Sequence, residues 1–187
     1  MINVYDFDKT ICFKDSTVGF WKFCIKKKPI ILTCLPIQFI SLVLYQIGIT
    51  KDMSLFYTYI KFFKGDEKYI KEFCDIQEKN ICEWYHKQKQ PTDVIVSASP
   101  EFLIKELCNR LNVRYVASQV DYKTGKYTKL PCKGKQKPTQ FYEKFQDEII
   151  NKSYGNAKSD IYMIKAGKEG YMVKNLSKTE VKITKIH

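Results

Sequence analysis

Three apolar segments of the chain each lead into a cluster of polar side chains. In chain order, these clusters are Asp6 with Asp8, Ser97 with Ser99, and Asn156 with Asp160. From residue 91 onward, segments that favour strands alternate with segments that favour helices, which predicts an α/β fold with a mostly parallel sheet flanked by helices. Because ligands of such sheets bind at the carboxyl ends of the strands, we expect the three clusters to share one site.

The pattern of apolar and polar residues also predicts where the elements lie. We expect strands within residues 2–7, 90–99, 114–120 and 170–175, and a strand followed by a loop at 152–160. We expect helices throughout 16–90, from 99 onward with Ser99 as N-cap and Pro100 at the first helical position, and over 138–150, with a hairpin at 121–128. The first strand is thus separated from the others by a long helical insert.

Asp6 and Asp8 stand two residues apart, so both carboxylates can face one side of an extended chain. Two carboxylates that lie close together need a cation or a shared proton. Mg²⁺ prefers oxygen ligands and often binds together with a phosphate, and one carboxylate could attack phosphorus while the other handles the proton of the leaving group. Taken alone, the pair is equally compatible with a solvated turn. Charged residues this early in the chain argue against a signal peptide.

Four motifs in the expected order resemble those of the haloacid dehalogenase (HAD) superfamily, in its phosphoserine-phosphatase-like branch. The motifs are DFDKT at 6–10, VIVSAS at 94–99, CKGKQK at 132–137 and YGNAKSDIYMI at 154–164, and AGKEGYMVKN at 166–175 is similar to the closing strand of that branch. The resemblance spans the whole chain. It implies a Rossmann-like core and a Mg²⁺-dependent phosphatase that forms an aspartyl-phosphate.

The resemblance assigns a role to each matching residue. Asp6 would be the nucleophile, and Asp8 the general acid and then the general base. Thr10 would orient the loop, and Ser97 would hydrogen-bond the phosphoryl group of the substrate. Lys137 would offset the negative charge of the transition state. Lys9 replaces the glycine that is common after the first motif, and Lys133 and Lys135 are expected to be solvated.

The resemblance also implies a metal site. Mg²⁺ would be held by Asp6, by the backbone carbonyl of Asp8, and by Asn156 and Asp160 of the fourth motif. Asn156 stands where the superfamily pattern has an aspartate, and an amide oxygen can bind Mg²⁺ but brings no negative charge. Metal binding should therefore be weaker unless Asp160 takes a larger share.

The helical insert corresponds to the cap that this branch places over the substrate. The expected division is a catalytic core of residues 1–14 and 91–187 and an all-helical cap of residues 15–90. Such a lid excludes water and carries specificity. Asp15, at the entrance of the insert, is expected either to contact the substrate or to cap a helix.

An uncharged stretch within the insert, Pro29–Ile49, follows Lys26, Lys27 and Lys28. Its roughly 21 residues are long enough to cross a bilayer, but a single crossing would separate the first motif from the other three. Two alternatives are left. The stretch is buried within the cap, which we favour, or residues 26–49 contact an anionic membrane surface.

The net charge of +12 suits nucleic acid, an anionic membrane or an anionic small substrate. Because the lysines are scattered and no nucleic-acid motif is found, we expect no specific nucleic-acid partner. The seven cysteines form no CxxC pair, which indicates reduced thiols in a cytoplasmic protein. The leading hypothesis is a phosphatase for a small phosphorylated metabolite. The alternatives are phosphotransfer to an alcohol acceptor, or a catalytically weak basic protein that binds at a membrane surface.

Overall fold

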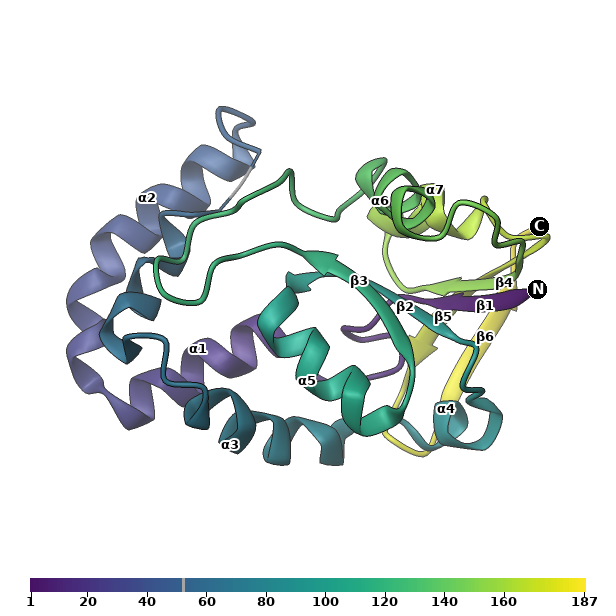
Figure 1. Ribbon diagram of the computed structural model, residues 1–187, viewed down its shortest axis with the longest axis horizontal. Coiled ribbons are helices and arrows are strands. Elements are labelled where there is room, and N and C mark those ends of the chain that lie inside the picture. The colour runs from purple at the N-terminus through teal and green to yellow at the C-terminus, as the bar shows by residue number, and fades with distance from the viewer. Residues whose placement is uncertain (52) are drawn as a thin grey trace.

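A six-stranded sheet forms the centre of the part of the protein that contains both termini, with its strands in the order β3-β2-β1-β4-β5-β6 (Figure 1). This computed structural model describes residues 1–51 and 53–187. The strands are β1 (Ile2–Tyr5), β2 (Val94–Pro100), β3 (Arg114–Ser118), β4 (Ile150–Gly155), β5 (Glu169–Asn175) and β6 (Val181–Lys185). Neighbouring strands from β3 to β5 are parallel, and β6 is antiparallel to β5. The predicted α/β fold with a mostly parallel sheet is confirmed.

Helices cover both faces of this sheet, and the alternation of side chains along the strands explains why. Ile2 and Val4 of β1 are buried against Phe141 of α6 (Gln136–Lys144) and Met163 of α7 (Ile161–Ile164). Tyr5 belongs to the other cluster, with side chains of α5 (Glu101–Leu111). Since successive residues of a strand point to opposite faces, one strand serves both layers.

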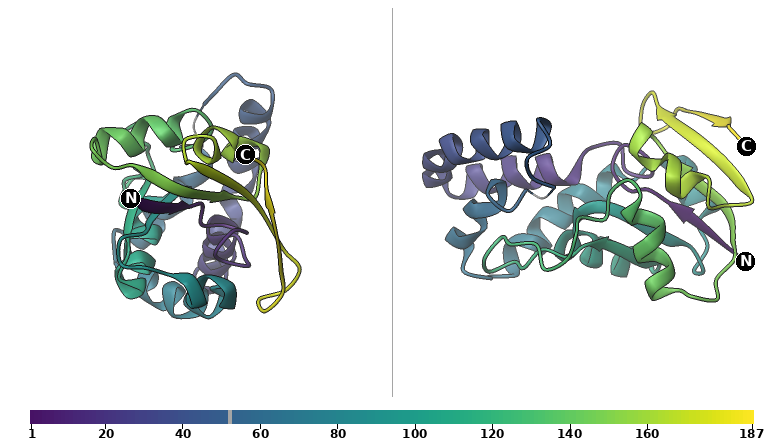
Figure 2. Two further views of the ribbon diagram at one scale, coloured as in Figure 1. Left: turned by 90° about the vertical axis from the view of Figure 1, so that its right-hand side faces the viewer. Right: turned by 90° about the horizontal axis from the view of Figure 1, so that it is seen from above.

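The insert between β1 and β2 contains no strand among its described residues, as predicted. Its elements are α1 (Ser16–Lys27), η1 (Pro29–Cys34), α2 (Leu35–Gln46), η2 (Phe56–Phe63), α3 (Lys68–Gln77), η3 (Glu78–Asn80) and α4 (Glu83–Gln88), where η marks a 3₁₀ helix. α1 and α2 lie at the end of the molecule remote from both termini, whereas α3 lies alongside α5 and α4 lies near the sheet (Figures 1 and 2).

Aromatic side chains join the insert to the core. The ring of Phe20 on α1 lies 5.2 Å from that of Phe73 on α3 and 5.8 Å from that of Phe102 on α5. Phe20 and Phe73 belong to the buried hydrophobic cluster that also includes Tyr5 of β1, and Phe102 packs against this cluster. The insert therefore shares a hydrophobic core with the sheet and α5, and the division into a core of residues 1–14 and 91–187 and a cap of residues 15–90 stays a prediction.

Several element boundaries differ from those predicted. The helix expected over 138–150 ends at Lys144, because β4 already begins at Ile150. The helix after β2 begins at Glu101 with Pro100 as its N-cap, so Ser99 is free to face the site. A further strand, β6, follows the one expected at 170–175 and is not predicted, because its mostly exposed, lysine-rich sequence lacks the apolar pattern of a buried strand. At 121–128 the chain makes a turn closed by a single bridge between Val120 and Tyr127.

The favoured burial of Pro29–Ile49 is wrong. Most of its apolar side chains face solvent, including Phe39 at 68% and Ile40 at 52% exposure, and on α2 the two buried residues are the polar Gln38 and Ser41. By length and composition alone, Pro29–Gln46 could cross a membrane, and 17% of it is buried. The elements that flank it pack together, however, with the rings of Trp21 on α1 and Phe56 on η2 6.4 Å apart. If Pro29–Gln46 crossed a membrane, α1 and η2 would have to come apart.

Candidate active site

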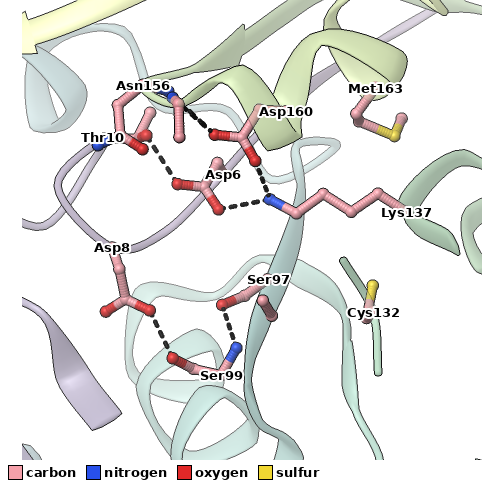
Figure 3. A network of polar contacts seen from close by, with 12 residues as sticks. Asp6, Asp8, Thr10, Ser97, Ser99, Cys132, Lys137, Asn156, Asp160 and Met163 are labelled. Carbon is pink, nitrogen blue, oxygen red and sulfur yellow. Dashed lines mark hydrogen bonds and ion pairs between the residues drawn. The ribbon is translucent and has the colours of Figure 1, made fainter. Parts of the chain in front are cut away.

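Asp6 follows β1 directly, in the middle of the sheet, and its carboxylate is held on both oxygens. The backbone N–H of Asp6 still pairs with the carbonyl of Tyr154 on β4, at 2.8 Å. The Thr10 hydroxyl donates to Oδ2 of Asp6 at 2.8 Å, and the Lys137 ammonium donates to Oδ1 at 2.6 Å (Figure 3). These two contacts fix the orientation of a nearly buried carboxylate.

Lys137 lies in the first turn of α6 and is 1% exposed. Its ammonium contacts Asp6 and also Oδ1 of Asp160, at 2.8 Å. Burial lowers the pKa of Lys137, but the two carboxylates outweigh it, so that the pKa lies above its ordinary value. The site thus contains a permanently charged cation between two carboxylates.

Asp160 closes the tight turn that follows β4. Its Oδ2 accepts hydrogen bonds from the backbone N–H groups of Asn156 and Ala157, at 3.2 and 3.0 Å. Gly155 permits this turn, because a Cβ at that position would lie 2.6 Å from the Cβ of Asp160. Both oxygens of Asp160 therefore already have protein donors, which makes this residue a brace for Lys137 and for the turn.

Asp8 faces a different set of partners from Asp6. Its Oδ1 accepts from the backbone N–H and the hydroxyl of Ser16, and its Oδ2 accepts from the hydroxyl of Ser99. Burial raises the pKa of Asp8 to about 7, with a further contribution from the negative charge of Asp15, while the hydrogen bonds of Ser16 and Ser99 oppose the rise. A carboxyl group with a pKa near neutrality is suited to give and take a proton.

The loop that carries both aspartates is tightly wound. Lys9 has a φ of 59°, in the left-handed region that glycine adopts without strain. This conformation gives a physical reason for the glycine of the superfamily pattern, although the loop forms here with lysine. Thr10 is fully buried behind Asp6.

Ser97 is fully buried, and its hydroxyl accepts a hydrogen bond from the backbone N–H of Ser99 at 3.1 Å. Asp15 caps α1 by accepting from the N–H of Val18 at 3.0 Å, and it also borders the cavity described next. The capping alternative is therefore confirmed for Asp15, and contact with the substrate stays a prediction. Lys133 and Lys135 are exposed, as expected.

A cavity of about 740 Å³ opens over the site. Its deep end is polar and is bordered by Asp6, Asp8, Lys137, Asn156 and Asp160. Its outer wall comes from the helical insert and is mainly apolar, with side chains from Trp21, Leu35, Phe39, Leu42, Met53 and Phe56. The cavity thus joins a charged end at the sheet to an apolar end beneath α2.

The residues at the deep end are compatible with a hard cation. All four residues expected to hold the metal border this end of the cavity. Asp6 and Asp160 would each supply a carboxylate, Asn156 an amide oxygen and Asp8 a backbone carbonyl, and an all-oxygen set is what Mg²⁺ prefers. No group of three His, Cys, Asp or Glu side chains that could hold a metal is found among residues 1–51 and 53–187. Because Lys137 lies beside both carboxylates and position 156 carries a neutral amide, we expect a cation to bind weakly.

The family of the chain follows from its match to known sequences. The model of the haloacid dehalogenase-like hydrolases matches residues 4–165, which includes every residue of the site described above. The chain belongs to the haloacid dehalogenase-like hydrolase family. No curated protein matches the chain significantly.

Several solved structures share the fold of this chain. A protein of unknown function from Bordetella pertussis Tohama I has a TM-score of 0.63 and 14% identity, with 88% of this chain and 86% of that chain covered. A HAD-family hydrolase from Salmonella enterica serovar Typhi has a TM-score of 0.57 and 15% identity, with 90% and 61% covered. A phosphoserine phosphatase, solved as a phospho-aspartyl intermediate analogue, has a TM-score of 0.54 and 14% identity, with 89% and 82% covered. At these identities the likeness establishes the fold alone.

The sequence predicts most residues of this haloacid dehalogenase-like site but not the hydrogen bonds of Asp8. Ser99 is expected both in the shared site and as the N-cap of the next helix, and the alternation of Ser97 and Ser99 in VIVSAS agrees with the site, because it places both on the same side of β2. Ser16 is expected only as the start of the helical insert. Nothing in the sequence indicated that Ser16 would contact Asp8.

Proposed function

We propose that this haloacid dehalogenase-like hydrolase is a Mg²⁺-dependent phosphomonoester hydrolase that acts through an aspartyl-phosphate on Asp6. The observation that carries the proposal is the difference in surroundings between the two carboxyl groups that follow β1, those of Asp6 and Asp8. Asp6 is fixed by Lys137 and Thr10, while Asp8 has a pKa near neutrality and borders the same cavity. One carboxylate is thus placed as a nucleophile and the other as a proton carrier.

In the first step, a carboxylate oxygen of Asp6 attacks phosphorus, and the bond from phosphorus to the ester oxygen breaks. Asp8 gives its proton to the departing oxygen, which leaves as an alcohol. In the second step, Asp8 takes a proton from a water that attacks phosphorus, and the acyl-phosphate bond breaks. Inorganic phosphate leaves, and both carboxyl groups return to their starting states.

Lys137 stabilises the charge that builds up on the phosphoryl oxygens, because its ammonium is fixed beside Asp6 before the substrate arrives. Asp160 holds Lys137 in place from the other side. Asp6, the backbone carbonyl of Asp8, Asn156 and Asp160 would hold the Mg²⁺. When bound, this ion supplies further positive charge beside the phosphoryl group.

The test is hydrolysis of p-nitrophenyl phosphate with and without Mg²⁺. We expect turnover that a chelator abolishes, and a loss of at least about 10³-fold in Asp6→Asn, because a neutral amide cannot attack phosphorus. Asp147→Asn, which removes one carboxylate from an exposed turn, is the matched control and should retain full activity. Equal activity of wild type and Asp6→Asn, or full activity in chelator, would contradict the proposal.

A further inference from the structure

The helix α2 has its apolar and polar sides reversed with respect to a helix of a water-soluble protein. Such a helix normally buries its apolar residues and exposes its polar ones. In α2 the buried residues are Gln38 and Ser41, and Gln38 is bonded inward, accepting from the indole N–H of Trp21 at 3.2 Å and donating to the carbonyl of Phe56 at 3.3 Å. The exposed apolar residues of this helix, the α2 apolar face, are Leu35, Ile37, Phe39, Ile40, Leu42 and Val43.

This face belongs to a larger concentration of exposed apolar side chains. Of the 21 large apolar residues that are exposed in the described chain, ten lie between Ile30 and Ile49. Isolated exposed apolar residues are normal, but a contiguous group of this kind marks a surface that something covers. Figures 1 and 2 show α2 at the outer edge of the molecule, where an extended flat surface could reach it.

Charge around this face indicates what covers it. From Lys22 to Lys51 the chain contains five lysines and no acidic residue. Lys26 and Lys51 are exposed, and Lys133 reaches the hydroxyl of Tyr45 on α2 at 2.7 Å. Lys27 is paired with Glu72 and contributes less. A second copy of the chain would bring like charges together, whereas an anionic bilayer offers both an apolar layer and opposite charge.

The same face reaches into the active-site cavity. Leu35, Phe39 and Leu42 are exposed on α2 and also border the cavity whose deep end holds Asp6. A ligand that fills this cavity would place a phosphate at the charged end and an apolar group beneath α2. Between the outer surface and Asp6, the cavity wall contributed by the insert is therefore mainly apolar.

We propose that the α2 apolar face docks on an anionic bilayer surface, and that the substrate is a phosphomonoester with a long apolar chain taken from that surface. This proposal rests on the proposed hydrolase activity for its substrate, but not for its docking. The chemistry that recognises the substrate is a phosphate dianion at one end and a hydrocarbon chain at the other. Small polar phosphomonoesters leave the apolar wall of the cavity uncovered.

Docking is tested by sedimentation with vesicles of phosphatidylcholine and phosphatidylglycerol in a 3:1 ratio. We expect wild type to sediment with these vesicles, and a smaller fraction to sediment in high salt. Vesicles of pure phosphatidylcholine should bind it more weakly. Ile40→Asp should lower vesicle binding at least tenfold, while its melting temperature and its hydrolysis of p-nitrophenyl phosphate stay unchanged. Ile76→Asp on α3 is the matched control, because Ile76 and Ile40 are both 52% exposed, and it should bind as wild type does.

The substrate class is tested with soluble alkyl phosphates below their micellar concentration. We expect kcat/KM for decyl phosphate to exceed that for butyl phosphate at least tenfold, and Phe39→Ala to reduce that ratio. A flat dependence on chain length would overturn the substrate class. Absence of vesicle binding by wild type, or a lipid-independent dimer that Ile40→Asp dissociates, would overturn the docking. Failure of the hydrolase proposal is recognised separately, since p-nitrophenyl phosphate would then not be hydrolysed whether or not vesicles are bound.

Discussion

The hydroxyl of Ser99, at the end of β2, donates a hydrogen bond to the carboxylate of Asp8, which lies beyond the end of β1. Ser16, the first residue of α1, contacts the other oxygen of the same carboxylate. The proton carrier of the proposed reaction is thus held between the sheet and the helical insert. Any movement of α1 relative to β2 would alter the environment of Asp8.

Removal of the Ser99 hydroxyl should slow the reaction without changing the fold. One hydrogen bond is worth roughly 1–1.5 kcal/mol, so we expect Ser99→Ala to lower kcat about tenfold with little change in KM. Ser177→Ala, in the exposed turn before β6, serves as the control. Steady-state kinetics on p-nitrophenyl phosphate gives kcat and KM for the two variants and for wild type. A Ser99→Ala variant with wild-type kcat would show that this contact does not orient Asp8.

Replacement of Lys137 should affect stability as well as activity. Without its ammonium, Asp6 and Asp160 would be buried without a counter-charge, and breaking such a buried pair costs about 3–5 kcal/mol. We therefore expect Lys137→Met to lower the free energy of unfolding in urea by that amount and to abolish turnover. Lys135→Met, at an exposed position two residues away, should do neither. Equal urea midpoints for Lys137→Met and wild type would refute the assigned role of the ammonium.

The amide at position 156 should limit metal affinity. Asn156→Asp adds a negative charge at the expected metal site, so we expect it to bind Mg²⁺ about tenfold more tightly, as judged by the Mg²⁺ concentration at half-maximal activity and by calorimetry. Asn109→Asp adds the same charge on the exposed surface of α5. If both variants respond to Mg²⁺ as wild type does, Asn156 is not a ligand.

Stability should depend on pH through Asp93, which is buried at the start of β2. Burial raises the pKa of this carboxyl from 3.8 to about 6, and its Oδ2 accepts a hydrogen bond from the N–H of Gln90. The folded state therefore binds the proton more tightly than the unfolded chain does. The resulting stabilisation is complete below about pH 4 and is lost as the pH rises through about 6.

A neutral side chain at position 93 removes this dependence. We expect Asp93→Asn to gain stability relative to wild type between pH 4 and pH 7, by on the order of 2 kcal/mol. Urea unfolding of both proteins across this range measures the difference. A difference that is constant with pH would show that Asp93 has an ordinary pKa in the folded protein.

Much of the site was predictable because parallel strands end at a common edge. Asp6, Ser97 and Asp160 each follow or close a strand, and that rule is enough to bring them together. Contacts between the insert and the core were not predictable, since the approach of Ser16 to Asp8 depends on how α1 packs. The exposure of α2 was mispredicted for a similar reason. An apolar segment is expected to be buried, and only the structure shows that Gln38 and Ser41 occupy the inward side.

Phosphorylation of Asp6 is tested most directly by rapid acid quenching during turnover. After incubation with ³²P-labelled p-nitrophenyl phosphate and Mg²⁺, wild type should carry label that hydroxylamine removes, as expected for an acyl-phosphate. Reduction with borohydride should convert Asp6 to homoserine, which mass spectrometry of the N-terminal peptide would detect. Asp6→Asn should carry no label. Label on any other residue, or sustained turnover by wild type with no trappable label, would contradict the account.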